Sequence, residues 1–168
     1  MNTPLIVTAD FSPADFAFFD AERRAHYPPE RNILSAHLTL FHALPPSVEP
    51  ELKRRLAQTA DRVAPRALLA GLRSLGGGVA YVVDSEELTN LREDLAEAFA
   101  GCLTRQDIQG WRPHVTIQNK VNPLRARELL IEKQRHFRPR PIGFAGFALH
   151  RYQGGPWLTV QRWAFRGG

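Results

Sequence analysis

Two tetrapeptides of the chain share one pattern: a histidine, an apolar residue, a threonine and a second apolar residue. They are His37-Leu38-Thr39-Leu40 and His114-Val115-Thr116-Ile117. From the composition, two such tetrads among the six histidines have odds of roughly one in a thousand. A single tetrad would indicate only a threonine-bearing strand with a surface histidine, but its repetition indicates a paired site.

Two histidines can supply both proton transfers of an in-line displacement at phosphorus, in which the nucleophile loses a proton and the leaving oxygen gains one. Because the pKa of imidazole is about 6.5, one ring can be neutral while its partner is protonated near neutral pH. Threonine hydroxyls can donate hydrogen bonds to the non-bridging phosphate oxygens. The tetrads therefore predict a metal-independent phosphoesterase in which His37 and His114 are the acid–base pair, in either order, and Thr39 and Thr116 bind the phosphate.

Strands are the elements that must position these side chains, because alternate residues of a strand point to opposite faces. Alternation puts each histidine on one face with the threonine of its tetrad, and the apolar residues behind them in the core. It also predicts that Phe41 lies on the face of His37, where its ring can stack on a base. His42 is predicted on the opposite face with a structural role, and the spacing assigns no role to His150.

The rest of the chain supplies alternating strand and helix patterns joined by Pro- and Gly-rich turns. Their order mixes hairpins with crossovers, which favours an α+β architecture over a doubly wound parallel sheet. Strands are predicted at 4–9, 36–43, 66–75, 79–83, 114–121, 144–151 and 157–165. Helices are predicted at 13–26, from a cap at Ser47 to about 63, from 84 or 85 to about 102, and at 122–135.

Length and composition are those of one globular domain over residues 1–168, with 43% hydrophobic and 23% charged residues. The net charge of +5 is compatible with a phosphate-bearing partner, but it is equally well explained by base composition. Cys102 is the only cysteine, so an internal disulfide is excluded and a reducing, cytoplasmic location is expected. No segment has the length of a membrane span, and we expect a monomer that does not interact with membranes.

The paired tetrads, in the two halves of a chain of this length, resemble the two-histidine (2H) phosphoesterase superfamily. Within it, the chain is most similar to the bacterial 2′-5′ RNA ligase and cyclic phosphodiesterase group. The resemblance covers nearly the whole chain, and rests on segments 37–44 and 112–117 together with the C-terminal segments 155–157 and 162–165. It implies an α+β fold with two lobes, each a mostly antiparallel sheet with helices outside, and pseudo-two-fold symmetry around a central cleft. It implies no metal or cofactor.

The resemblance also implies a substrate, either an RNA end or a small nucleotide phosphodiester, with His37 and His114 as the catalytic pair. Tyr152 and Trp157, near the last turn, are expected at the border of the cleft. The sequence departs from the family pattern after each tetrad. Phe41-His42-Ala43 replaces a common Phe-Leu-Gly, and Lys120 follows the second tetrad where an arginine is common, so we expect Lys120 to take over phosphate binding.

Two other functions use the same residues. A non-catalytic module would bind RNA or a nucleotide and release no product. A metallohydrolase would use the histidines as ligands, but zinc sites need three or more protein ligands and no further ligand has the required spacing near either tetrad.

Overall fold

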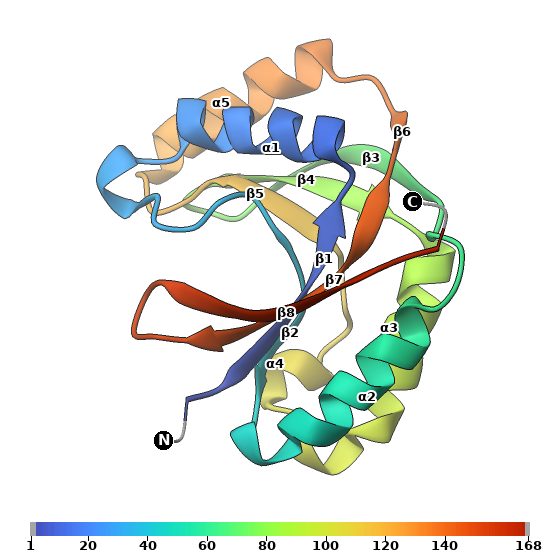
Figure 1. Ribbon diagram of the computed structural model, residues 1–168. Coiled ribbons are helices and arrows are strands. Elements are labelled where there is room, and N and C mark those ends of the chain that lie inside the picture. Colours follow the sequence, from blue (N-terminus) through green and yellow to red (C-terminus); the bar gives the residue numbers. More distant parts are fainter. Residues whose placement is uncertain (1–2, 167–168) are drawn as a thin grey trace.

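The computed structural model describes residues 3–166, which form two four-stranded antiparallel sheets (Figure 1). The first sheet has the order β2-β1-β7-β8, over Leu38–Leu44, Leu5–Phe11, Phe144–Tyr152 and Trp157–Ala164. The second has the order β5-β4-β3-β6, over His114–Gln118, Val79–Asp84, Ala67–Ser74 and Arg140–Ile142. The predicted α+β class with two antiparallel sheets is confirmed.

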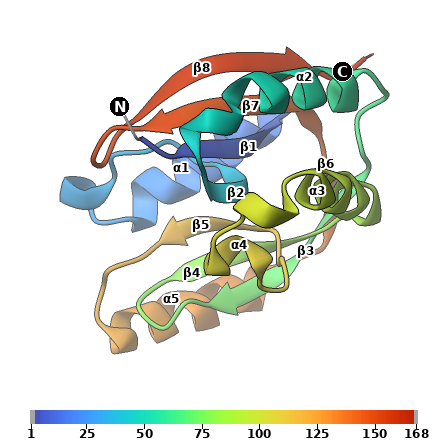
Figure 2. The same ribbon diagram turned by 90° about the horizontal axis from the view of Figure 1, so that it is seen from below.

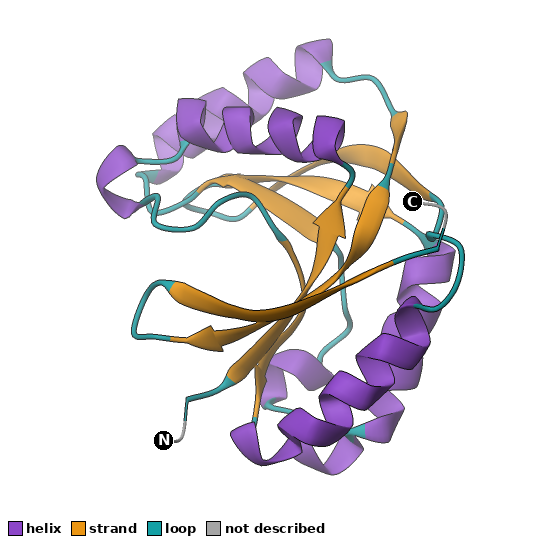
Figure 3. Ribbon diagram, in the orientation of Figure 1, coloured by secondary structure: helices purple, strands orange, loops and turns teal. Residues whose placement is uncertain are grey.

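The helices lie on the outside of the strands (Figure 3). The α-helices are α1 Pro13–His26, α2 Glu49–Ala60, α3 Glu86–Ala98, α4 Arg105–Ile108 and α5 Pro123–His136. Short 3-10 helices occur at Pro29–Arg31, Pro46–Val48 and Ala100–Cys102. Helix α1 packs against β5 and α5 against β3, whereas α2 packs against β7 and β8 (Figures 1 and 2). Among the residues described, no helix is long and apolar enough to cross a membrane.

Several helix starts follow from local chemistry. Pro13 and Pro123 occupy the first turns of α1 and α5, where a missing N–H costs nothing. The side chains of Ser85 and Asn122 accept hydrogen bonds from the first turns of α3 and α5. The predicted cap at Ser47 is wrong, because Pro46–Val48 form a separate 3-10 turn and α2 begins at Glu49.

Both tetrad strands carry a β-bulge directly after the threonine. In β2, Thr39 lies opposite Thr8 but Phe41 lies opposite Val7, so Leu40 is the extra residue. In β5, Thr116 lies opposite Ala80 and Gln118 opposite Val79, so Ile117 is the extra residue. A bulge reverses the alternation of the residues that follow it, and its occurrence at the same position in both strands agrees with the predicted pseudo-symmetry.

The tetrad strands β2 and β5 are edge strands of their sheets, and they contact each other. The two motifs, 77 positions apart from His37 to His114, therefore meet where the two sheets meet. Behind both strands lies one continuous apolar core that includes Leu38, Leu40, Val115 and Ile117. This core holds the tetrad strands in place, so the tetrads lie on rigid elements, as a site with defined geometry requires.

Candidate active site

One face of each sheet carries the tetrad threonine, and we call it the tetrad face. On the first sheet, the hydrogen-bonded row runs from Thr39 through Thr8 and Ala148 to Arg162. On the second sheet, it runs from Thr116 through Ala80 to Arg73. Residues in such a row project from the same side of a sheet, so each threonine shares its face with an arginine.

His37 and His114 are anchored in the same way. The Nδ1 of His37 lies 2.8 Å from the carbonyl oxygen of Ser35, and the Nδ1 of His114 lies 2.9 Å from that of Arg112. A carbonyl oxygen can only accept a hydrogen bond, so the proton is on Nδ1 in both rings. The Nε2 atom of each ring is thereby left available to a substrate.

Burial lowers the pKa of His37 to about 4, and the hydrogen bond from its ring to Ser35 opposes this shift. The charge of Arg23 lowers the pKa of His37 further, as do His150 and His114 when they are protonated. Since the charge of His114 acts on His37, the two rings are electrostatically coupled across the contact between β2 and β5. Protonation of one ring therefore disfavours protonation of the other.

Burial also lowers the pKa of His114, and the hydrogen bond to the Arg112 carbonyl opposes the shift. The charges of Arg73 and His42 lower it further. In the ligand-free protein both catalytic candidates are therefore mostly neutral at pH 7, and a bound anion is needed to favour protonation of either one.

Arg23 is a buried cation of the site that the sequence analysis missed. Its side chain comes from α1 and is only 4% exposed. Its Nη1 donates to the carbonyl oxygen of Thr116, at 3.2 Å, and its Nε donates to Asn32 Oδ1, at 2.8 Å. It thus joins the second tetrad to the loop that leads into the first. Only the three-dimensional structure shows this, because α1 carries no motif.

A pocket of about 540 Å³ lies beside His37, over the tetrad face of the first sheet. Its lining includes Trp157, and the Trp157 ring centroid is 4.7 Å from that of His37. Tyr152 pairs with Trp157 across the hairpin but is 41% exposed and does not line the pocket. The structure therefore places Trp157 in the lining of the pocket and Tyr152 outside it.

His150 also lines this pocket, although the sequence assigned it no role. It is 7% exposed, and its two ring nitrogens lie 2.9 Å from Thr8 Oγ1 and Thr159 Oγ1. Burial, and next the charge of Arg162, lower its pKa to about 4, against the effect of Asp10. His150 is thus a neutral polar group in the pocket at pH 7, and its ring centroid lies 5.2 Å from that of Trp157.

One expectation from strand alternation is wrong. Phe41 does not share the face of His37, because the bulge at Leu40 turns it into the core, where it is fully buried under Arg92. It therefore cannot stack on a base. Lys120 lies beyond the end of β5, after the bulge at Ile117, and has a left-handed backbone with φ of 62°. Its side chain is exposed, and its role in phosphate binding stays a prediction.

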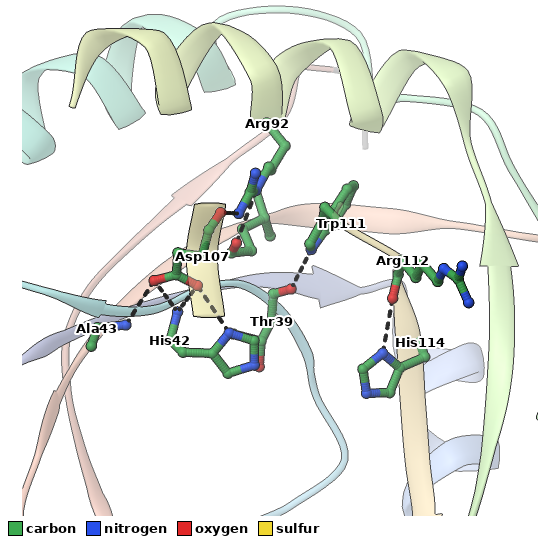
Figure 4. A network of polar contacts seen from close by, with 9 residues as sticks. Thr39, His42, Ala43, Arg92, Asp107, Trp111, Arg112 and His114 are labelled. Carbon is green, nitrogen blue, oxygen red and sulfur yellow. Dashed lines mark hydrogen bonds and ion pairs between the residues drawn. The ribbon is translucent and has the colours of Figure 1, made fainter. Parts of the chain in front are cut away.

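Polar side chains of Asp107, Arg92 and Trp111 bind the backbone of the bulged stretch of β2 (Figure 4). The Asp107 carboxylate accepts hydrogen bonds from the backbone N–H groups of His42 and Ala43, at 2.9 to 3.1 Å. Arg92 Nε donates to the carbonyl oxygen of Leu40 at 3.1 Å, and Trp111 Nε1 donates to that of Thr39 at 3.0 Å. These contacts satisfy backbone groups of the bulged segment.

The described residues contain no group of three or more histidine, cysteine, aspartate or glutamate side chains that could hold a metal ion. The tetrads and the neighbouring Arg23 contribute imidazoles, hydroxyls and a guanidinium group, from His37, His114, Thr39, Thr116 and Arg23.

Comparison with known proteins identifies the family that the two tetrads resemble. The family model described as the 2′-5′ RNA ligase superfamily matches residues 11–156. Among solved structures, TT0787 of Thermus thermophilus aligns with a TM-score of 0.66 and 19% identity over 99% of both chains. LigT of E. coli in complex with 3′-AMP aligns with a TM-score of 0.62 and 19% identity, also over 99% of both chains.

A third structure, described only as a phosphoesterase, aligns with a TM-score of 0.64 and 21% identity over 98% of this chain and 99% of that one. No curated protein matches the chain. At these identities the structural matches show a common fold, whereas the family match spans most of the chain. The chain therefore belongs to the 2′-5′ RNA ligase superfamily.

Proposed function

We propose that this protein is a metal-independent phosphoesterase that acts on 2′,3′-cyclic phosphate ends or 2′-5′ linkages of RNA or small nucleotides. One observation carries the proposal. Two histidines with carbonyl-anchored Nδ1 atoms and available Nε2 atoms lie at the starts of contacting strands, each with a threonine on the same face. This arrangement can present a base and an acid to one phosphorus atom.

Opening of a cyclic phosphate then proceeds by in-line attack of water. One histidine Nε2 takes the proton of the water as its oxygen bonds to phosphorus. The other, protonated when the anionic substrate binds, gives a proton to the ribose oxygen as its bond to phosphorus breaks. Each well-placed acid or base contributes about 10²–10⁴-fold to the rate.

The surrounding groups stabilise the charge that develops on the non-bridging oxygens. Thr39 and Thr116 can donate hydrogen bonds there, from the two sides of the site. Arg23 and Arg73 supply positive potential, which acts on the two histidines in the free protein and would act on a phosphate between them. Arg23 is held by its own hydrogen bonds, so its contribution is through its charge.

The pocket beside His37 has the properties of a nucleoside site. Its volume of about 540 Å³ is within the range of small-molecule pockets, which is about 300–1,000 Å³. Trp157 offers an aromatic face, while His150 and Thr159 offer polar atoms. Structures of E. coli LigT are described as complexes with 3′-AMP, NADP+ and ATP, which supports a nucleotide ligand for the site proposed in this chain.

The deciding experiment is hydrolysis, in EDTA, of an oligoribonucleotide that ends in a 2′,3′-cyclic phosphate and of a 2′-5′-linked dinucleotide. We expect the wild type to turn over at least one of them, and His37→Ala and His114→Ala each to lose at least about 100-fold in kcat. His136→Ala, at the exposed end of α5, is the matched control and should keep full activity.

Full activity in either tetrad variant would exclude the proposed mechanism. Salt-sensitive binding without any product would favour the binding module instead. Activity that is lost with chelator and restored by zinc would favour a metallohydrolase.

A further inference from the structure

His42 lies on the tetrad face, not on the opposite face predicted from simple alternation. The bulge at Leu40 turns Phe41 into the core, so the next residue returns to the side of Thr39. The exposures agree: the His42 side chain is 39% exposed, whereas Phe41 and Leu44 are fully or almost fully buried. His42 therefore adds an exposed imidazole to the tetrad face, besides the histidines of the two tetrads.

A buried carboxylate fixes the orientation of this ring. Asp107 is 1% exposed, and its Oδ1 lies 3.0 Å from His42 Nδ1. Burial raises the pKa of Asp107, but the hydrogen bonds from the His42 ring and from the backbone N–H groups of His42 and Ala43 outweigh this, so the net pKa is lowered. An ionised carboxylate only accepts, so Nδ1 of His42 carries a proton and Nε2 faces outward. A histidine held in this way can bind a ligand or exchange a proton through its Nε2 atom.

The ring lies beside the second catalytic candidate. A positive charge on His42 lowers the pKa of His114, as does that of Arg73 from the second sheet. In Figure 4, the rings of His42 and His114 extend toward the same side from their two strands. The pocket beside His37 does not include His42, His114 or Arg73. The site thus extends in two directions, toward the pocket and toward His42.

We propose that His42, held by Asp107, binds a second phosphate of the substrate, next to the phosphate that is attacked between His37 and His114. A protonated His42 can donate its Nε2–H to a phosphate oxygen in a charge-assisted hydrogen bond, and Arg73 adds positive potential at the same end. The inference rests on the proposed function for the position of the attacked phosphate. It assigns the protein to substrates with at least two phosphates.

Two sources of the second phosphate have the same chemistry: the internucleotide phosphodiester of an RNA end, and a 5′-phosphate on a mononucleotide. Three substrates separate them. They are adenosine 2′,3′-cyclic phosphate, the same nucleotide with a 5′-phosphate, and a diadenylate that ends in a 2′,3′-cyclic phosphate. Only the first lacks a second phosphate.

The test compares kcat/KM for these substrates between wild type and His42→Gln, which keeps the backbone hydrogen bonds to Asp107. We expect a loss of about tenfold on at least one two-phosphate substrate, the size of one charge-assisted hydrogen bond, and less than about twofold on the single-phosphate substrate. His42→Lys should restore a large part of the loss because it restores the cation. His136→Gln is the control and should change nothing.

An equal loss on all three substrates would overturn the proposal, because His42 would then act on the chemistry or the fold. No loss on any substrate would overturn it as well. A binding measurement keeps this result separate from the proposed function: titration calorimetry with adenosine 2′-phosphate and adenosine 2′,5′-bisphosphate.

If His42→Gln weakens only the bisphosphate while the wild type turns over no substrate, the second phosphate site stands and the phosphoesterase proposal fails. If the wild type turns over substrate but His42→Gln changes neither selectivity nor bisphosphate binding, the phosphoesterase proposal stands and the second phosphate site fails.

Discussion

The pKa values of His37 and His114 are lowered by their surroundings, and among the residues that the structure describes neither ring has an acidic hydrogen-bond partner. Each donates its Nδ1–H to the carbonyl oxygen two residues earlier in the chain. Backbone carbonyls fix the tautomer without adding a negative charge, so burial and neighbouring cations determine the pKa of each ring. The outcome is two imidazoles that are neutral in the free protein at pH 7 and respond to a bound anion.

This tuning predicts a pH optimum below neutrality. The reactive form carries one proton on the pair, so its population grows as pH falls below 7 and declines again as His37 also becomes protonated, near pH 4. The cyclic phosphodiester itself does not titrate in this range. We expect a bell-shaped profile of kcat/KM with its maximum between about pH 4 and 6.5. Steady-state kinetics across this range checks it, and a maximum above pH 7 would contradict the assignment.

At the scale of elements, the bulge in β2 depends on α4. His42 and Ala43 lie in a second register shift of the same bulged stretch, between the pairs Phe41–Val7 and Leu44–Leu5, and Asp107 accepts hydrogen bonds from both of their N–H groups. The carbonyl oxygen of Asp107 in turn accepts a hydrogen bond from Arg92 of α3, at 2.7 Å. A short helix of four residues thus supports the strand that carries the first tetrad.

Asp107→Ala should therefore lower the free energy of unfolding by about 3 kcal/mol at pH 7, because each buried donor left without a partner costs about 1–3 kcal/mol. The pKa of Asp107 is lowered in the folded protein, so its stabilisation is present above the unfolded pKa of about 3.9 and is lost as pH falls through the folded value. Urea denaturation at pH 7 and at progressively lower pH measures both effects.

Asp94→Asn, on the exposed side of α3, is the control for this measurement and should leave the free energy of unfolding unchanged within about 0.5 kcal/mol. A loss in Asp107→Ala no larger than in this control would show that the bulge does not need Asp107.

At the scale of the whole molecule, the two sheets are interleaved along the chain. The first sheet is built from both ends of the chain and the second from the middle. Arg23 crosses between them, since it comes from α1, bonds to Thr116 of β5 and to Asn32 before β2, and stacks 4.2 Å over the Tyr27 ring. Arg23 therefore links the second tetrad to the segment that leads into the first.

Arg23→Met should have two separate effects. It should lower kcat at least about tenfold, because the two tetrads are no longer held in fixed relative positions and the catalytic groups lose a nearby positive charge. It should also raise the pKa of His37, since the charge of Arg23 is one of the causes that lower it. NMR titration of the His37 ring in the folded variant measures this shift, which a purely structural role would not produce.

Arg24→Met is the matched control for this variant. Arg24 is the exposed neighbour of Arg23 and pairs only with Asp20 on the same helix, at 3.3 Å, among the described residues. It should leave both kcat and the titration of His37 unchanged. An unchanged pKa of His37 in folded Arg23→Met would contradict the electrostatic role assigned to Arg23.

The sequence by itself determined the two tetrads, the α+β class and most element positions, because these depend on local periodicity and on turn residues. The helices expected at 13–26 and 122–135, and the strands expected at 144–151 and 157–165, are confirmed to within one residue at each end. The short β6 and α4 were missed, since three or four residues carry too little periodic signal.

The tertiary structure alone decided what lies around the tetrads. Whether a strand bulges depends on the strand with which it pairs. The faces of the residues after Thr39 and Thr116 therefore could not be predicted from alternation along the sequence. That is why Phe41 was expected in the site and is buried, while His42 was expected behind it and lies on the tetrad face. Arg23 and Asp107 reach the site from distant positions in the chain, and only long-range packing places them there.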